Sequence, residues 1–449
     1  HMVRSAFRGQ DLPACTRQMT LSRGTKIVQK LARAYKGRRE RVPLKEIITL
    51  YDSHGIPPEI TRDVAIAEGA VIDLPDNFYS LIADMHSQAG EEEGQDPFAR
   101  YADRISGLPQ TRKLFYEQPC DMEFDAMVID YFDGYAVLDQ TLFYPEGGGQ
   151  PADTGMLISA ESMVRVDDVQ KVGEVIVHHI SGGMLRRGDR VKGIVDEERR
   201  WSLMRHHTAT HLLLHAAKEV LGAHIHQAGA QKGVESARLD IRHFKHISPD
   251  EERRIEIAAN RMVMSAQAVD IRHEERTKAE QLHGFALYQG GVPPGREIRI
   301  VQVAGDVEAC AGTHCKGTGE IGMIKIIRIE HIQDGIERLE FAAGMAAVEY
   351  VQQMEKTIAE ASSVLSVQAE NLPSTVQRIF TEWKEQKKEI ERTSQRLVEM
   401  EIGNLNPEMV KDLPVVIRRI DLPARDLAAI AATVAERGGV ALLASGSER

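Results

Sequence analysis

Two pairs of residues in this sequence have the types and the spacing of metal ligands. His207 and His211 stand four residues apart inside MRHHTATHLLLHA, which reads as an apolar helix. A helix brings side chains at positions i and i+4 onto one face. Cys310 and His314 repeat this spacing on a glycine-bearing segment about a hundred residues later. Three imidazoles and one thiolate suit tetrahedral zinc, so the sequence predicts one zinc site.

The predicted set of ligands leaves the task of the zinc open. A hydrolytic zinc normally keeps one coordination position for water, whereas four protein ligands close the tetrahedron. Either one ligand is loose, or the metal expands its coordination, or it positions a substrate without making the nucleophile. Two polar, glycine-bearing segments that read as loops, 144–155 and 227–233, could contribute to the site. In the first of them, the side chains able to reach a neighbouring site are Glu146, Gln150 and Asp153.

The composition limits the class of protein. With 449 residues, 42% hydrophobic and 27% charged, the chain is an ordinary globular protein of about two to four domains. Its apolar runs are shorter than the ~18–20 residues of a membrane span. Four cysteines form no disulfide framework in so long a chain, which predicts a reducing, cytoplasmic setting. The net charge of −11 argues against indiscriminate nucleic-acid binding, yet two basic clusters stand out, one with Arg38 and Arg39 and one with Arg186 and Arg187.

Changes in pattern divide the chain into parts. Residues 20–110 read as mostly helical. Alternating apolar and polar residues, punctuated by Gly and Pro, then predict a small antiparallel barrel or sandwich up to about residue 197. A helix closed by Gly222, several strands and a helix with a Ser248–Glu251 capping box predict a two-layer α+β domain.

The last hundred residues change pattern again. An interrupted apolar stripe predicts a helical hairpin that pairs with another chain. A strand, a helix and a strand then form half of an α/β unit. Because such a half-unit is hard to stabilise alone, we expect the chain to be a fragment of a longer protein.

Taken together, these motifs resemble the alanyl-tRNA synthetase family, of archaeal type. FYPEGGGQPADTG is similar to the glycine-rich signature of the barrel before the editing domain, and RHHTATHLL, QAGAQKG and EACAGTHC are similar to the editing core. The resemblance implies zinc ligands at His207, His211, Cys310 and His314. It also implies editing roles for Thr210 and for the glutamine of the Gln-Lys-Gly motif, Gln231, with Gln227 as the alternative four residues earlier.

The resemblance extends to tRNA recognition. LYDSHGIPPEIT, residues 50–61, is similar to a block of the family's tRNA-recognition region, which implies that Asp52 helps to read the acceptor-stem G·U pair. Beside an RNA-directed site, the basic clusters become phosphate contacts, at Arg38, Arg39, Arg186 and Arg187. The block departs from the family's pattern at Ser53-His54 and at Ile56.

The expected fold is therefore multidomain α+β. Its parts are a helical tRNA-recognition domain (1–115), a small antiparallel β-barrel with the glycine-rich motif (116–197), a two-layer α+β editing domain with zinc (198–345), a helical dimerisation hairpin (346–403) and a truncated α/β globular domain (404–449). The resemblance implies an editing fragment without the aminoacylation core. It would hydrolyse the ester of mischarged Ser-tRNA(Ala) or Gly-tRNA(Ala) and form a homodimer through its C-terminal helices.

Two other functions stay open. The chain could be a stand-alone trans-editing deacylase of the same family, although the 50–61 block and the hairpin disfavour this. It could instead be a non-catalytic RNA-binding module with structural zinc. Incubation with Ser-tRNA(Ala) and Ala-tRNA(Ala) separates the two classes, because only an enzyme cleaves the ester.

Overall fold

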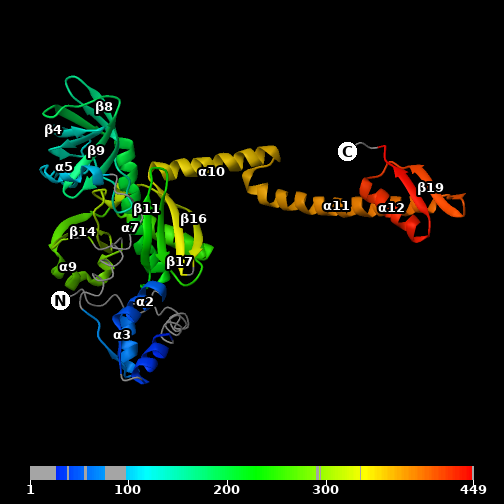
Figure 1. Cartoon of the computed structure of the whole chain (residues 1–449), viewed down its shortest axis with the longest axis horizontal. Coiled ribbons are helices and arrows are strands. Elements are labelled where there is room, and N and C mark those ends of the chain that lie inside the picture. The colour runs from blue at the N-terminus through cyan, green and yellow to red at the C-terminus, as the bar shows by residue number, and fades with distance from the viewer. Residues whose placement is uncertain are drawn as a thin grey trace. The chain divides into compact units, whose positions relative to one another are not determined.

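Helix-rich and strand-rich segments alternate along the chain. The computed structural model describes residues 27–37, 40–54, 58–75, 98–289, 293, 295–333 and 335–446. The chain divides into two compact units, His1–Val351 and Gln352–Arg449, and each has its own helices and strands (Figure 1). The expected mixed, multidomain α+β architecture is confirmed at this level. Arg38 and Arg39 lie outside the described residues.

The N-terminal part is helical where it is described. A helix covers residues 27–37, and α2 (Leu44–His54) and α3 (Pro58–Ala67) follow it. Two short strands, β1 (Arg41–Val42) and β2 (Val71–Ile72), pair in parallel. A small apolar core holds these elements together and consists of Ala32, Val42, Ile47, Ala65 and Ala70.

A closed six-stranded barrel follows. Its strands are β4 (Glu123–Phe132), β5 (Tyr135–Leu138), β7 (Gly155–Ile158), β8 (Met163–Val172), β9 (Val175–Ser181) and β10 (Arg190–Val195). They join in the order β10-β4-β5-β9-β8-β7, all antiparallel, so the alternative of a sandwich is excluded. The β4–β5 hairpin turns at Asp133 and Gly134, which both have positive φ, as a tight two-residue turn requires. Alternate residues of β4 are buried, which explains the period of two in the sequence.

The next layer pairs one long helix with a four-stranded sheet. Helix α7 (Glu197–Leu221) begins at Asp196, whose side chain accepts a hydrogen bond from the Arg199 amide. The sheet has the order β11-β12-β17-β16, with β11 (His226–Lys232), β12 (Ala237–Arg242), β16 (Ile324–Gln333) and β17 (Ile336–Ala343). Helix α8 (Pro249–Met264) packs beside α7 and begins with the predicted Ser248–Glu251 capping box. The QAGAQKG segment, expected to be a loop, lies mostly in strand β11.

A smaller sheet brings the second ligand pair to α7. It contains β13 (Asp270–Glu275), β14 (Glu297–Val303) and β15 (Asp306–Ala309), with helix α9 (Arg276–His283) and the 3-10 turn η2 (Gly284–Leu287) beside it. Most of α7 is buried, because it contacts α8 and strands of both sheets. The largest apolar core of the described residues surrounds this helix, so α7 is a rigid central element.

The C-terminal elements have the predicted order. Helix α10 (Met345–Val364) is followed by α11 (Leu372–Gly403). After them come β18 (Glu408–Val410), β19 (Leu413–Arg419), α12 (Ala424–Glu436) and β20 (Val440–Ala444), and β19 pairs with β20 in parallel. Among the described residues, no helix is both long and apolar enough to span a membrane.

Candidate metal centre

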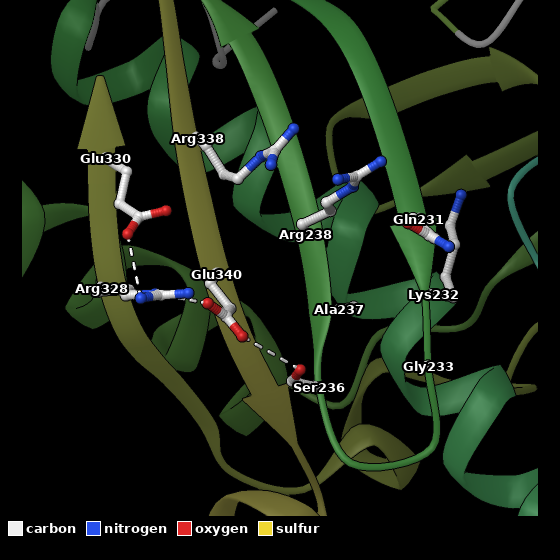
Figure 2. A pocket seen from close by; sticks show the side chains of 10 residues that line it. All are labelled: Gln231, Lys232, Gly233, Ser236, Ala237, Arg238, Arg328, Glu330, Arg338 and Glu340. Atoms are coloured by element: carbon white, nitrogen blue, oxygen red, sulfur yellow. Dashed lines mark hydrogen bonds and ion pairs between the residues drawn. The ribbon is translucent and has the colours of Figure 1, made fainter. Parts of the chain in front are cut away.

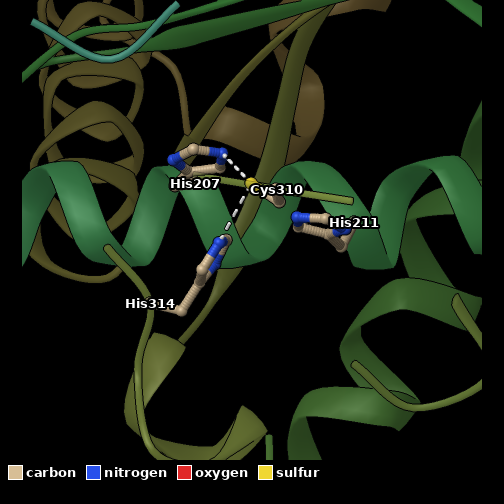
Figure 3. Close-up of side chains that lie close together, drawn as sticks. All are labelled: His207, His211, Cys310 and His314. Carbon is tan, nitrogen blue, oxygen red and sulfur yellow. Dashed lines mark hydrogen bonds between the residues drawn. The ribbon is translucent and has the colours of Figure 1, made fainter. Parts of the chain in front are cut away.

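The two predicted ligand pairs converge on one point. His207 and His211 come from consecutive turns of α7, while Cys310 and His314 come from the segment after β15 (Figure 3). One nitrogen from each imidazole and the thiol sulfur all lie within 4.8 Å of one another. Cys310 Sγ is 3.3 Å from His207 Nε2 and 3.3 Å from His314 Nε2. The structure therefore brings together all four residues of the predicted set.

These residues fit a zinc ion. Zn–S bonds of ~2.3 Å and Zn–N bonds of ~2.0–2.1 Å at a tetrahedral angle put sulfur and nitrogen about 3.5 Å apart, close to the observed 3.3 Å. The three histidines are buried, and Cys310 is partly buried. A mixed set of imidazole nitrogens and one sulfur is typical of zinc, so the site is a candidate zinc centre.

Each imidazole is oriented by a partner at its other nitrogen. The Nδ1 of His207 lies 2.8 Å from Gln150 Oε1, and that of His211 lies 3.0 Å from Asp306 Oδ2. The third, on His314, is 3.4 Å from Thr208 Oγ1. All three rings thus turn Nε2 toward the centre of the cluster. Such outer partners fix the tautomer and the orientation of a metal-bound histidine.

The electrostatics favour the metal-binding forms of three of these residues and oppose that of His211. Burial lowers the pKa of His207 well below its usual value and that of His314 to about 4, which favours the neutral imidazoles that bind metal. Burial opposes a Cys310 thiolate, but His207 and His314 outweigh it and hold the thiol pKa well below its ordinary value. Burial also opposes a charged His211, yet Glu308 and Asp306 raise its pKa well above the usual range. Metal binding therefore displaces a proton from His211.

A glycine allows the two segments to approach. A Cβ on Gly312 would lie 1.9 Å from Cε1 of His207, so any side chain here would push the imidazole away. Tyr116 holds the same segment from outside, because its hydroxyl donates to the Ala311 carbonyl at 2.8 Å. Arg299 Nη1 donates to the Cys310 carbonyl at 2.7 Å. These contacts fix the backbone that carries the thiolate.

The glycine-rich loop of the barrel belongs to this site. Gln150 is fully buried, and besides meeting His207 it donates from Nε2 to Thr313 Oγ1 at 2.8 Å. Gly149 packs against β11 so closely that a Cβ would lie 2.2 Å from the Ala230 carbonyl oxygen. The Lys232 amide donates to the Gly149 carbonyl at 2.7 Å. The loop therefore joins the barrel to the candidate metal centre. Gln150 is among the side chains expected from the sequence to be able to reach a neighbouring site.

A buried ion pair also joins helix α7 to the barrel. Arg200 on α7 and Asp153 in the barrel loop are both fully buried, and Arg200 Nε lies 3.0 Å from an Asp153 carboxylate oxygen. The guanidinium also donates to the carbonyls of Leu142 and Pro119, at 2.5 and 3.1 Å. Asp153 accepts from the Tyr144 amide at 2.6 Å. All three guanidinium nitrogens of Arg200 therefore form hydrogen bonds with the barrel or with the segment just before it.

Sequence reasoning missed two acidic neighbours of the ligands. Asp306 and Glu308 are both buried, and Asp306 joins His211 to Lys218, whose Nζ lies 3.0 Å from Oδ1. Burial raises the pKa of Glu308 well above its usual value. The signal was present in the spacing, since D-x-E-x-C on a strand puts Asp306, Glu308 and Cys310 on one face.

The two predicted catalytic residues lie differently. Thr210 is buried on α7 between the candidate ligands His207 and His211, and its hydroxyl donates to the His206 carbonyl at 2.8 Å. Gln231 is exposed and pairs with Arg238, which is also exposed, so it lies on the sheet face away from α7. Gln227 pairs with the buried Ile241 and so lies on the α7 side, because a bulge between Gln227 and Gly229 shifts the register.

Three of the predicted tRNA contacts lie in the described part of the chain, on elements other than those that carry the candidate ligands. Asp52 lies in α2, and Arg186 and Arg187 are exposed on the loop before β10. Arg186 forms an ion pair with Glu161 of the barrel at 3.0 Å. These residues lie on separate elements and remain predictions.

Comparisons with known proteins find relatives that match nearly the whole chain. A model described as "tRNA synthetases class II (A)" matches residues 16–199, and one described as "Threonyl and Alanyl tRNA synthetase second additional domain" matches residues 298–340. The alanine–tRNA ligase of Methanoregula boonei is 70% identical over 96% of this chain and 47% of that protein. The chain belongs to the alanyl-tRNA synthetase family. The ligases of Methanoculleus marisnigri and Methanospirillum hungatei are 64% and 57% identical, over 95% and 96% of this chain and 47% of each protein.

Membership of the alanyl-tRNA synthetase family has two consequences for the site. The chain spans about half the length of the ligases it matches, 47% in each of these three cases. The second additional domain model covers Cys310 and His314, whereas the helical pair, His207 and His211, falls between the two matched regions. The structure therefore adds half of the ligand set to what the family models cover.

Proposed function

We propose that this chain is the editing part of an archaeal-type alanyl-tRNA synthetase and hydrolyses the ester of mischarged Ser-tRNA(Ala) or Gly-tRNA(Ala). The observation that carries the proposal is the buried set of His207, His211, Cys310 and His314, with each imidazole oriented by a partner. A water oxygen bonds to the carbonyl carbon, the ester C–O bond breaks, and a proton passes to the ribose oxygen. The products are the free amino acid and uncharged tRNA.

The residues around the metal centre suggest how serine is selected. The Thr210 hydroxyl already gives its proton to the His206 carbonyl, so its oxygen is left as an acceptor. A seryl hydroxyl can donate to that oxygen, whereas an alanyl methyl group cannot. Buried polar groups reject analogues that lack their partner far more strongly than apolar pockets do. Thr210 therefore acts as the residue that distinguishes serine from alanine.

Zinc bound by these residues would act as a Lewis acid that polarises the ester carbonyl. Gln227, on the α7 side of β11, is better placed than Gln231 to orient water or the ester. Lys232 is buried on the same side, and its Nζ donates to the Gly148 carbonyl at 3.1 Å. Burial lowers the pKa of this lysine, because a charged ammonium group loses hydration there, while the nearby Cys310 thiolate favours the charged form.

The layout that we propose has five parts. They are a helical tRNA-recognition domain (1–115), the barrel (116–197), the zinc-containing editing domain (198–345), a helical dimerisation hairpin (346–403) and a globular domain (404–449). Exposed apolar side chains along α11 support pairing with a second copy, and Phe380 and Trp383 are about half exposed. We propose a reducing, cytoplasmic location, because Cys310 is a free cysteine that must stay a thiolate to bind zinc.

Measuring deacylation by the wild-type chain and by Cys310→Ala tests the proposal. The wild-type chain is expected to release serine from Ser-tRNA(Ala) and to leave Ala-tRNA(Ala) intact. Cys310→Ala is expected to lose both zinc and hydrolysis, whereas Cys120→Ala, at a free cysteine outside the ligand set, keeps both. An undiminished rate after loss of zinc would remove the metal from the mechanism.

A non-catalytic RNA-binding module is the second candidate, and one observation favours it. Four protein ligands complete a tetrahedron and leave no position for water, which is typical of structural zinc. Tight binding of Ser-tRNA(Ala) by the wild-type chain, with the ester left intact, would establish this alternative. A stand-alone trans-editing enzyme is less favoured, because relatives that match nearly the whole chain are alanine–tRNA ligases.

A further inference from the structure

The four-stranded sheet has one face covered by helices and one face open to solvent. Ala237, Leu239 and Ile241 of β12 are buried against the core around α7. Successive residues of a strand point to opposite faces, so Arg238 and its cross-strand partner Gln231 lie on the other face. Both are exposed. The face opposite α7 is therefore a polar surface that the proposed hydrolysis does not use.

This open face contains a shallow hollow. Figure 2 shows that its lining comes from all four strands, and the hollow has a volume of about 330 Å³. Three arginines from different strands contribute to the lining: Arg238, Arg328 and Arg338. Glu330 and Glu340 also line the hollow, so its affinity for an anion depends on which arginines stay unpaired.

Ion pairs leave one of these arginines available. Arg338 meets Asp240 through two bonds of 2.6 and 2.8 Å, and Arg328 meets Glu340 at 2.6 Å. Arg238 makes no ion pair or side-chain hydrogen bond with any residue in the described part of the chain. An exposed guanidinium without a partner is free to bind an anion, while its neighbours are held rigid.

The same strand leads to an aromatic cluster. Just beyond the end of β12, Phe244 is 48% exposed, and its ring centre lies 5.1 Å from that of His224 and 4.8 Å from that of His243. Burial lowers the pKa of His243 to about 4, so this ring is neutral, and its buried Nε2 has no hydrogen-bond partner among the described residues. From Arg238 to Phe244 an extended chain covers about 20 Å.

We propose that this surface, from Gln231 and Arg238 to Phe244, binds the single-stranded 3′ end of the RNA substrate. Arg238 would bind a phosphate, and an unpaired base would stack on Phe244 and His224. Sheets that carry arginines and exposed aromatic rings recognise single-stranded RNA in this way. A protein partner is less suited, because the hollow is lined by charged pairs rather than by the apolar core of a protein interface.

This inference rests on the proposed function for the identity of the ligand, but it adds a separate surface. The edge strand β11 lies between the surface and the metal centre, with Lys232 and Gln227 on the inner side and Gln231 on the outer side. An RNA strand that crosses this edge can place its aminoacylated end at the zinc while its preceding nucleotides stay on the outer face. The two glutamines would then both contact substrate, on opposite sides of one strand.

Binding of uncharged RNA tests the surface without any hydrolysis. The probe is a hairpin RNA with a short single-stranded 3′ extension, and its affinity for the full chain is measured over a range of salt concentrations. Arg238→Ala is expected to weaken binding and to reduce the slope of log K against log salt by about 1, the effect of losing one phosphate contact. Arg254→Ala, at an exposed position on α8, is the matched control and keeps the wild-type slope.

A second variant tests the aromatic end. Phe244→Ala is expected to weaken binding of the extended hairpin about 5-fold or more, as loss of one stacked base does, and to leave the blunt hairpin unaffected. An unchanged salt slope for Arg238→Ala, or equal losses on both hairpins for Phe244→Ala, would overturn the proposal. If the chain binds as expected but cleaves no Ser-tRNA(Ala), the surface stands and the editing function fails.

Discussion

At the scale of single residues, Gln150 has the most specific task. It reaches from the barrel to the Nδ1 of His207 and also binds Thr313, next to the ligand His314. A neutral histidine that binds metal through Nε2 must carry its proton on Nδ1. The amide oxygen of Gln150 accepts a hydrogen bond from this N–H group. The geometry of the candidate metal site is therefore set in part by the barrel.

Replacing Gln150 by Ala should weaken zinc binding without removing a ligand. We expect the zinc affinity to fall about 10- to 100-fold, the usual effect of losing an outer partner of a metal-bound histidine. Competition with a coloured chelator measures it. Gln140→Ala is the matched control, because this amide donates to the Asp125 carbonyl of β4 and not to the glycine-rich loop. Equal affinity in Gln150→Ala and wild type would contradict the assigned role.

The residue scale also shows what spacing can predict. The four candidate ligands could be chosen from the sequence, because i and i+4 on a helix share a face and the second pair repeats that interval. Asp306 and Glu308 were within reach of the same argument by strand alternation. The contact of Gln150 with His207 was not predictable, because the two residues are 57 positions apart in the sequence and lie on different elements. The choice between Gln227 and Gln231 depends on a β-bulge, whose position a single sequence does not reveal.

At the scale of elements, the glycine-rich loop and strand β11 act as one joint. The loop can lie against the strand only because Gly149 has no side chain, and Gly148 and Gly149 both have positive φ. The Lys232 amide and side chain then bind the two glycine carbonyls. The position of the barrel relative to the metal centre therefore depends on a backbone contact.

Two neighbouring glycines separate crowding from backbone strain. Gly149→Ala is expected to displace the loop, weaken zinc binding and lower the thermal midpoint. At Gly148, φ is +60° and nothing lies within 4 Å of an added Cβ. Gly148→Ala should therefore be less stable by only ~1 kcal/mol, the cost of the left-handed conformation, and should keep its zinc affinity. Thermal unfolding and chelator competition on both variants measure the difference. Identical behaviour of the two would show that crowding at Gly149 is unimportant.

The elements themselves were mostly predictable. The capping box at Ser248 and the helix that ends before Gly222 follow from local hydrogen bonding and from glycine geometry. Strand β11 was mistaken for a loop because QAGAQK lacks β-branched and aromatic residues. It forms a strand because β12 supplies a full set of pairing partners, a tertiary effect that overrides local preference.

At the scale of the whole molecule, buried histidines make stability depend on pH. Outside the metal centre, burial lowers the pKa of four histidines to about 4: His178, His206, His226 and His243. In the unfolded chain their pKa is about 6.5. Between these two values the unfolded chain binds more protons than the folded chain, so the free energy of unfolding falls as the pH falls.

Denaturant titrations of the metal-free chain should show this dependence. We expect the free energy of unfolding to be highest above about pH 6.5 and to fall steadily toward about pH 4. His178→Gln keeps a hydrogen-bonding side chain in the barrel core but removes one titrating group, so its slope should be shallower. A profile that is flat between these pH values would show that the histidines are solvated in the folded state.

The order of helix-rich and strand-rich segments along the chain was predictable, because patterning changes where one gives way to the next. What patterning does not reveal is which parts depend on each other. Arg200 and Asp153 read as ordinary charged residues in the sequence, and only the structure shows both fully buried against one another. Long-range pairs of this kind leave no periodic signal.

The Arg200–Asp153 pair also bears on how this protein can be inherited. Losing either partner alone leaves a buried charge unpaired, at a cost of about 3–5 kcal/mol. A recombination between residues 153 and 200 keeps the pair only if one parent supplies Asp153 and the other supplies Arg200. We therefore expect the barrel and helix α7 to be inherited together, with viable recombination points outside residues 153–200.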